Sequence, residues 1–166
     1  MADMSAPAGP VRSIGSLVLA FALCFSAARL GSIATTPNLG WYATLAKPFF
    51  TPPNWAFPVA WTTLFILMAI ALWRVATRAA EPRQRQLALG AFMVQLLLNI
   101  GWSFAFFGQQ NPALGLAVIA ALIIAIAATM ALFRPIDRIA SLLLLPYILW
   151  VCYAGLLNAT IWWMNA

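Results

Sequence analysis

The chain has 166 residues, of which 64% are hydrophobic and 7% are charged, and its net charge is +6. Ordinary soluble domains are about 45–50% apolar and about 25% charged, so this chain has too few charged residues to form the polar surface of a water-soluble fold. Its high apolar content also excludes disorder. The absence of histidine excludes histidine metal sites and a Ser-His-Asp triad. The composition therefore predicts a chain that resides in a lipid bilayer.

Five stretches are long and apolar enough to cross the hydrocarbon core, which takes about 20 residues. The predicted helices are 13–34, 56–77, 87–107, 112–133 and 138–163, after a short tail, residues 1–12. Asn111, a good N-cap, and Pro112 divide the long uncharged run between the third and fourth helices, and Asp137 is placed to cap the last. Because lipid offers no partners to open sheet edges, we expect an all-α membrane protein. It would be a five-transmembrane-helix bundle, a single domain over 1–166, with a structured first external loop.

The first predicted helix has a second interpretation. Residues 1–12 could form the basic start of a signal peptide, with small residues at 26–28 as a cleavage site. The apolar run is slightly long for such a signal, and we retain it as a helix of the mature chain.

The distribution of basic residues predicts the orientation in the membrane. One side of a five-span chain would carry seven of the nine, and the other would carry Arg29 and Lys47. The seven are Arg12, Arg74, Arg78, Arg83, Arg85, Arg134 and Arg138. This asymmetry predicts a cytoplasmic N-terminus, with the C-terminus and the first loop on the opposite side. Because the charge flanks spans and forms no single patch, it argues against a nucleic-acid partner.

The first loop is rich in prolines and aromatic residues. Four prolines fall within residues 48–58, and they stiffen the segment and stop it from continuing a helix. Its aromatic residues are Trp41, Tyr42, Phe49, Phe50, Trp55 and Phe57. Such residues can form an interfacial belt at headgroup depth, or a rigid lid over the bundle. We expect the loop to serve in both ways, with the lid somewhat favoured.

Polar groups within the spans fall on definite helix faces. Gln95, Asn99, Trp102 and Phe106 share one face of the third predicted helix, and Pro146, Trp150, Ala154, Leu157 and Asn158 share one face of the fifth. Amides in hydrocarbon must face protein or a cavity, so each could simply bond a neighbouring helix. Their combination with Trp61, Trp102 and Trp150 favours a pocket with aromatic walls and a few directional polar groups.

A basic residue, two cysteines and a row of small residues are the other features of the predicted spans. Arg29 either extends to the headgroups or, together with Lys47, anchors an acidic group of a ligand. Cys24 and Cys152 lie in predicted spans and receive no function. In the fourth helix, small residues at helical spacing predict a packing or dimer surface. They are Ala113, Ala117, Ala121, Ala125 and Ala128, with Gly115 nearby.

The loop and the two polar faces together resemble the signature of the TspO/MBR family. These are the tryptophan-rich sensory proteins of bacteria, similar to the mitochondrial translocator protein, or peripheral-type benzodiazepine receptor. The resemblance covers residues 15–165. Its motifs here are Trp41-Tyr42, Leu45, Lys47-Pro48, Pro52-Pro53, Phe57-Pro58, Trp61, Gln95, Asn99, Trp102, Phe106-Phe107-Gly108, Pro146-Tyr147, Trp150, Tyr153-Ala154 and Leu157-Asn158.

The resemblance implies a commonly dimeric protein of a bacterial membrane that binds porphyrins, such as protoporphyrin IX or a haem-like tetrapyrrole, as ligands with no required cofactor. It would act as a sensor, receptor or carrier in tetrapyrrole metabolism and stress response. An alternative is light- and oxygen-dependent breakdown of protoporphyrin IX, using Tyr42, Trp61 and Trp150. The pocket amides would be those of Gln95, Asn99 and Asn158.

This chain departs from the family pattern in two places. After Asn158 it lacks the tyrosine and basic residue that cholesterol-binding members carry, so cholesterol binding is doubtful. Leu114 stands where some relatives have a tryptophan. No intramembrane carboxylate or histidine could act as a general base or couple an ion gradient, which disfavours a conventional enzyme and an ion-coupled exporter.

Overall fold

The computed structural model describes residues 10–166, and every regular element within them is helical. The predicted all-α five-span bundle is confirmed, because five helical segments are long and apolar enough to cross a membrane. The elements are α1 (Pro10–Thr35), the 3-10 turn η1 (Thr36–Asn38), α2 (Leu39–Thr44), α3 (Ala56–Arg78), α4 (Pro82–Ser103), the π-helical η2 (Phe104–Gly108), α5 (Pro112–Phe133), α6 (Arg138–Leu143) and α7 (Leu145–Met164). Most of the tail predicted over 1–12 lies outside the described residues.

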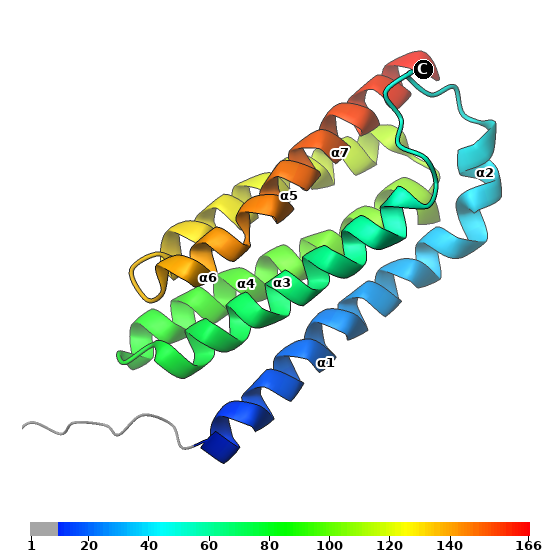
Figure 1. The fold of residues 1–166 in the computed structure, drawn as a ribbon. Helices are drawn as coiled ribbons and strands as arrows, with labels where there is room; N and C mark the ends of the chain where they lie inside the picture. Colours follow the sequence, from blue (N-terminus) through cyan, green and yellow to red (C-terminus); the bar gives the residue numbers. More distant parts are fainter. Residues whose placement is uncertain (1–9) are drawn as a thin grey trace, which may run out of the picture.

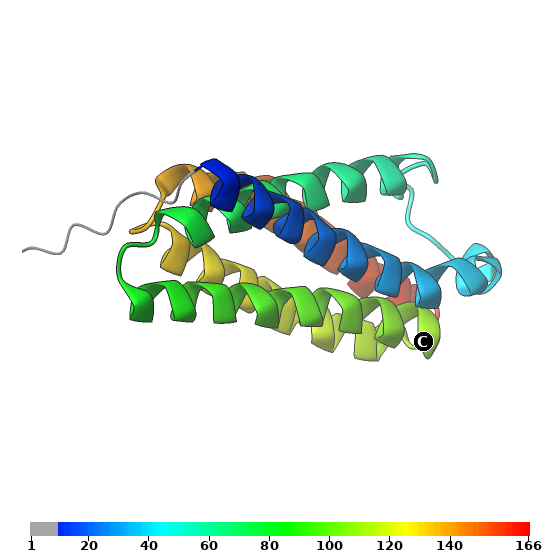
Figure 2. The ribbon, with the colours of Figure 1, turned by 90° about the horizontal axis from the view of Figure 1, so that it is seen from below.

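The helices run along one common direction, so the bundle has two distinct ends (Figure 1). At one end, called here the loop end, lie α2, the chain of residues 45–55 and the end of α7. At the other, called here the arginine end, lie the α3–α4 turn (79–81) and the α5–α6 turn (134–137). Helix α1 packs against α3 and α4, and α5 packs against α4 and α7. Figure 2 shows α1 lying obliquely across the bundle.

Large apolar side chains from four helices fill the centre. Met68, Phe92, Phe133 and Tyr147 are fully buried, and the Phe92 and Phe133 rings stack with centroids 6.0 Å apart. Burying a side chain of this size stabilises a water-soluble protein by about 1.5–3 kcal/mol. In a membrane the equivalent gain comes from close packing, because lipid is itself apolar.

Capping side chains set the starts of two helices as predicted. The Asn111 side chain accepts a hydrogen bond from the Leu114 amide, which begins α5. The Asp137 carboxylate accepts hydrogen bonds from the amides of Ile139 and Ala140, which begins α6. Each satisfies amides at a helix start that have no partner within the helix.

Helix α4 begins five residues before the predicted start at 87. Pro82 occupies the first turn, where its missing N–H costs nothing, so Arg83 and Arg85 lie in the helix and not before it. The prediction placed the start where the uncharged run begins. A membrane helix need not end with the hydrocarbon, because its terminal turns can continue into the headgroup region.

The last span, predicted as one helix over 138–163, is broken at Leu144 into α6 and α7. Pro146 has no N–H to donate within the helix, and its ring clashes with the preceding turn. The Leu144 amide instead donates to the Ser141 carbonyl, which tightens the chain at the junction.

The third span ends in a π-helix, which the helical pattern over 87–107 does not predict. The Gln109 amide donates to the Phe104 carbonyl, five residues earlier, at 2.8 Å. The wider turn allows three consecutive side chains, those of Ala105, Phe106 and Phe107, to be buried together.

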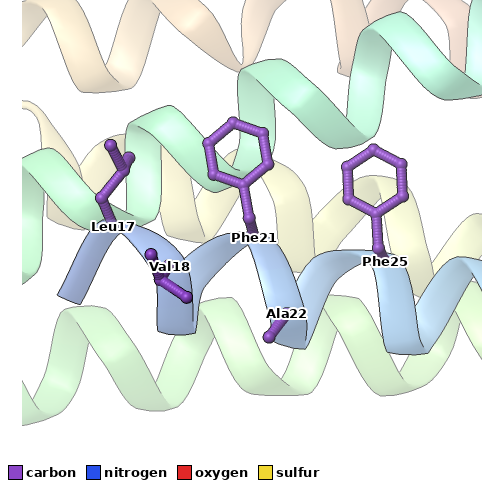
Figure 3. A pocket seen from close by; sticks show the side chains of 5 residues that line it. All are labelled: Leu17, Val18, Phe21, Ala22 and Phe25. Carbon is purple, nitrogen blue, oxygen red and sulfur yellow. The ribbon is translucent and has the colours of Figure 1, made fainter. Parts of the chain in front are cut away.

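A shallow apolar groove of about 470 Å³ lies along α1 (Figure 3). Its lining residues are Leu17, Val18, Phe21, Ala22 and Phe25. The rings of Phe21 and Phe25 stack with centroids 6.2 Å apart. None of the predicted site residues lines this groove.

Candidate functional site

The first loop is fastened to the bundle at the loop end. The Tyr153 hydroxyl on α7 donates to the Phe50 carbonyl at 2.6 Å. Asn165 pairs with Ala46 twice, because its Oδ1 accepts from the Ala46 amide and its Nδ2 donates to the Ala46 carbonyl, both at 3.0 Å. The loop therefore has a defined position over the ends of the helices, as its prolines predict.

Before the prolines, the loop is helical. Helix α2 places the aromatic rings of Trp41 and Tyr42 against η2, where both contact Phe106 with centroids 5.6 and 6.2 Å apart. Tyr42 also packs against Phe107, at 5.7 Å. Two of the predicted aromatic residues of the loop are thus half-buried against the bundle.

Lys47 lies beside this group. Its ammonium is 4.9 Å from the centre of the Tyr42 ring and donates to the carbonyls of Ala43 and Leu45. These contacts hold the ammonium group beside the Tyr42 ring.

The aromatic side chains continue inward from Phe106 to the middle of the bundle. Trp102 stacks on Phe106 at 5.6 Å, and Trp61 stacks on Trp102 at 6.4 Å. Tyr147 meets the edge of Trp61 at 6.4 Å. These residues, with Tyr42, are called here the inner aromatic row: Tyr42, Phe106, Trp102, Trp61 and Tyr147.

Two of the three predicted pocket amides bond to neighbouring helices. Asn99 on α4 donates to the Tyr147 hydroxyl at 3.0 Å. Asn158 on α7 accepts from the Trp102 indole at 3.2 Å and donates to the Pro112 carbonyl at 2.7 Å. Asn158 therefore joins α4, α5 and α7, which fits the interpretation of these amides as interhelical partners.

Gln95 is different. Its side chain is 1% exposed, and neither its amide nitrogen nor its amide oxygen has a hydrogen-bond partner within the described residues. The Tyr42 hydroxyl and the Trp150 indole N–H are also buried and have no hydrogen-bond partner within the described residues. A buried polar group without a partner costs about 1–3 kcal/mol. Three such groups in one bundle are therefore candidates for contact with a ligand.

Trp150 belongs to a second aromatic group on the α7 side. It packs against Phe57 at 6.1 Å and Tyr153 at 5.8 Å, and Tyr153 in turn contacts Phe50 of the loop. Ala154, one turn beyond Trp150, is half-buried against the main core. This second group lies beneath the loop through Tyr153 and Phe50.

The structure therefore brings some of the predicted site residues into contact with one another and leaves others apart. Tyr42, Trp61 and Trp102 belong to the inner aromatic row, and Asn99 and Asn158 bond to its members. Arg29 lies elsewhere, since it is exposed on α1 and donates to Ser32 of the same helix at 3.4 Å. Its placement supports extension to the headgroups more than ligand anchoring.

Tyr147 and Phe107 are two residues of this region that reasoning from helix faces did not single out. Tyr147 lies three residues before Trp150, so the helical spacing of the last span could have indicated it. Phe107 is buried together with Phe106 in η2, whereas the helical face predicted for the third span ended at Phe106.

Most of the alanine face of α5 is exposed in this chain, and Ala125 is half-buried. Helix α5 buries Gly115, Ile119, Leu122 and Ile126. Gly115, which lies near this face, packs closely against Asn158 and Phe106. The use of the alanines as a packing or dimer surface stays a prediction.

The arrangement defines a class of protein: a multi-pass helical membrane protein with a fastened loop over an interior rich in tryptophan, tyrosine and amides. Known proteins resemble this chain in sequence along most of its length. The model of the TspO/MBR family matches residues 18–164, and the chain belongs to that family.

Individual relatives extend from bacteria to mammals. The chain is 42% identical to "Tryptophan-rich protein TspO" of Chlorobaculum tepidum over 93% of this chain and 98% of that relative. It is 41% identical to "Protein CrtK" of Rhodobacter capsulatus, over 87% of this chain and 89% of the relative. It is 32% identical to the human "Translocator protein", over 75% of each chain.

Proposed function

We propose that the protein binds a planar, hydrophobic tetrapyrrole such as protoporphyrin IX inside the bundle, and that it acts as a sensor, receptor or carrier for it. The three buried polar groups without partners, on Tyr42, Gln95 and Trp150, carry this proposal. A porphyrin offers pyrrole nitrogens, carboxylates and a wide aromatic face. It could therefore satisfy such groups and also stack on the neighbouring rings.

The rings that would receive the ligand contact one another in this structure. Trp61 and Trp102 are stacked at 6.4 Å, with their planes 29° apart. A porphyrin would enter by replacing ring–ring contacts with ring–porphyrin contacts of the same kind, while Lys47 at the loop end pairs with a propionate. Binding would then require the side chains to rearrange beneath the fastened loop.

Tryptophan fluorescence tests this proposal. Titrating the detergent-solubilised protein with protoporphyrin IX in the dark should quench the emission saturably. Trp150→Ala should weaken binding about tenfold, because stacking by one such residue contributes about 0.5–1.5 kcal/mol and its N–H adds a hydrogen bond. The matched control is Trp163→Ala, which alters a tryptophan that is 80% exposed at the end of α7 and should leave the affinity unchanged. Absence of saturable quenching at micromolar porphyrin would contradict the proposal.

Gln95 allows a second readout. Gln95→Leu removes both unpartnered atoms at similar volume, so the free protein should become more stable to heat in detergent while its affinity for porphyrin falls. A residue that serves only the fold would not change the two quantities in opposite directions.

Light-driven breakdown of the bound porphyrin is a second candidate function. The ring contacts from Trp61 through Trp102 and Phe106 to Tyr42 favour it, because adjacent aromatic side chains could pass an oxidising equivalent from an excited porphyrin to the loop end. Illuminating the complex in air should then bleach porphyrin faster than in detergent alone, and Tyr42→Phe should slow the bleaching. Equal bleaching with and without protein would exclude this function.

We further propose that the arginine end faces the cytoplasm, because basic residues flank spans preferentially on that side. The exposed alanine face of α5 fits a second copy of the chain in a homodimer, since small residues allow helices to approach closely.

A further inference from the structure

A cavity of about 440 Å³ lies at the arginine end, away from the proposed porphyrin site. Its lining residues are Arg134, Arg138, Ser141 and Leu142. These residues come from the α5–α6 turn and from the start of the last span, next to two helical segments that are long and apolar enough to cross a membrane.

The two arginines of this cavity are free to bind an anion. Asp137 lies between them in the sequence, but its carboxylate is bonded to Arg74 and Arg78 of α3. Within the described residues, Arg134 and Arg138 form no ion pair or side-chain hydrogen bond, and both are exposed. Their positive charge is therefore not neutralised by the protein.

The other polar groups near the cavity already have partners. The end of α5 could repel an anion through its carbonyl oxygens. The Met130 carbonyl, however, accepts from the Arg134 amide and the Ser141 hydroxyl, and the Phe133 carbonyl accepts from the amides of Ile136 and Asp137. The surface of the cavity is itself mostly apolar, and the exposed guanidinium groups of Arg134 and Arg138 supply the charge beside it.

An exposed apolar strip continues from the cavity along the last span. Leu142 is 62% exposed, and Leu145 and Leu149 follow on α6 and α7 at about helical spacing, also exposed. A free inorganic anion would not contact this apolar strip. A phospholipid would contact both features, because its phosphate can pair with the arginines while its acyl chains lie along the leucines.

We propose that this cavity is a binding site for the headgroup of an anionic phospholipid, held by Arg134 and Arg138, with its acyl chains against Leu142 and the leucines beyond. Two guanidinium groups on one headgroup favour anionic over zwitterionic lipid, since a zwitterion brings its own positive charge close to them. The site is separate from the porphyrin site and does not depend on it.

Lipid binding to the detergent-solubilised full chain tests the proposal. Short-chain phosphatidylglycerol should bind at least tenfold more tightly than phosphatidylcholine of the same chain length, as measured by native mass spectrometry. Arg134→Gln with Arg138→Gln should weaken phosphatidylglycerol binding about thirtyfold, at about 1 kcal/mol for each guanidinium. Arg134→Lys with Arg138→Lys should retain most of it.

The matched control is Arg83→Gln with Arg85→Gln, which removes the same charge from exposed positions at the start of α4. It should change lipid affinity less than threefold. Equal loss in the two double variants would show attraction by overall charge alone and would overturn the proposal. Displacement of the lipid by equimolar inorganic phosphate would also overturn it. As a second variant, Leu142→Trp fills the cavity without changing charge and should also weaken binding.

Discussion

At the scale of single residues, Gly115 and Asn158 depend on each other. Asn158 bonds Trp102 on one side and the Pro112 carbonyl on the other, which requires α5 and α7 to approach closely. A Cβ added at Gly115 would lie 2.8 Å from the Asn158 oxygen and 3.0 Å from the Phe106 Cβ. Only glycine leaves room at this contact for both the amide and the ring.

Gly115→Ala should therefore destabilise the protein by about 1–3 kcal/mol, because Phe106 is buried and its Cβ cannot move without its backbone. The measurement is the thermal unfolding midpoint in detergent. Gly90→Ala is the control, since a Cβ there meets nothing within 4 Å and alanine favours the helix. A midpoint for Gly115→Ala at or above that of the unmodified protein would contradict the close approach.

At the scale of elements, Asp137 fastens three helices together at the arginine end. It caps α6 and is the last residue of the turn after α5. It also accepts two hydrogen bonds from Arg74 of α3, at 2.9 and 3.1 Å, and forms an ion pair with Arg78. Burial raises the pKa of this carboxyl, but the hydrogen bonds from Arg74, the Ala140 amide and Arg78 outweigh burial and hold the pKa below its usual value.

The pH dependence of stability follows from that direction. A carboxyl with a lowered pKa in the folded state contributes its full stability above the usual value near 3.8, and loses it as the pH falls through the lowered pKa. The unfolding midpoint should therefore fall on acidification below about pH 4. Asp137→Asn should unfold at a lower temperature at neutral pH and show a weaker acid dependence, because asparagine can still cap α6 but cannot form the ion pairs.

The loop forms a second connection between elements, through Asn165. Asn165→Ala removes both of its bonds to Ala46 and leaves the Tyr153 bond to Phe50 intact. Hydrogen exchange of the Ala46 amide should accelerate about fivefold or more, as expected for loss of a bond worth about 1 kcal/mol. Thr160→Ala is the control, because that hydroxyl bonds only within α7. Unchanged exchange at Ala46 would show that Tyr153 alone holds the loop.

At the scale of the whole molecule, the sequence predicts the spans well because the bilayer demands long uncharged helices, and local signals mark their starts. Asn111 and Asp137 cap their helices as expected, and Pro112 follows the first of them. Caps act within one turn, so they can be recognised without knowing the fold. The break at Leu144 is also local in origin, and Pro146 gives the signal for it.

The long-range pairs could not be predicted in this way. Helix faces placed Gln95 and Asn99 together, yet Asn99 bonds Tyr147 and Gln95 has no partner among the described residues. Which of two neighbouring amides meets a hydroxyl depends on the rotation and offset of another helix. The pairing of Asp137 with Arg74 and Arg78 is similar, since it joins residues some 60 positions apart. From the sequence, Asp137 is recognisable only as a helix cap, and the two arginines only as markers of membrane orientation.

The π-helix at Phe104–Gly108 has a consequence for how this segment tolerates changes of length. A π-turn is, in geometric terms, an α-turn with one residue inserted. Deleting one residue between Trp102 and Pro112 would relax the segment to an ordinary α-turn, while Trp102 and all of α5 kept their faces. The same deletion in the middle of α4 would rotate every following residue by about 100° and take Trp102 out of the aromatic row. The π-turn is thus the position in the third span where the chain could shorten with Trp102 and α5 still in register, while the burial of Phe106 and Phe107 within η2 would change.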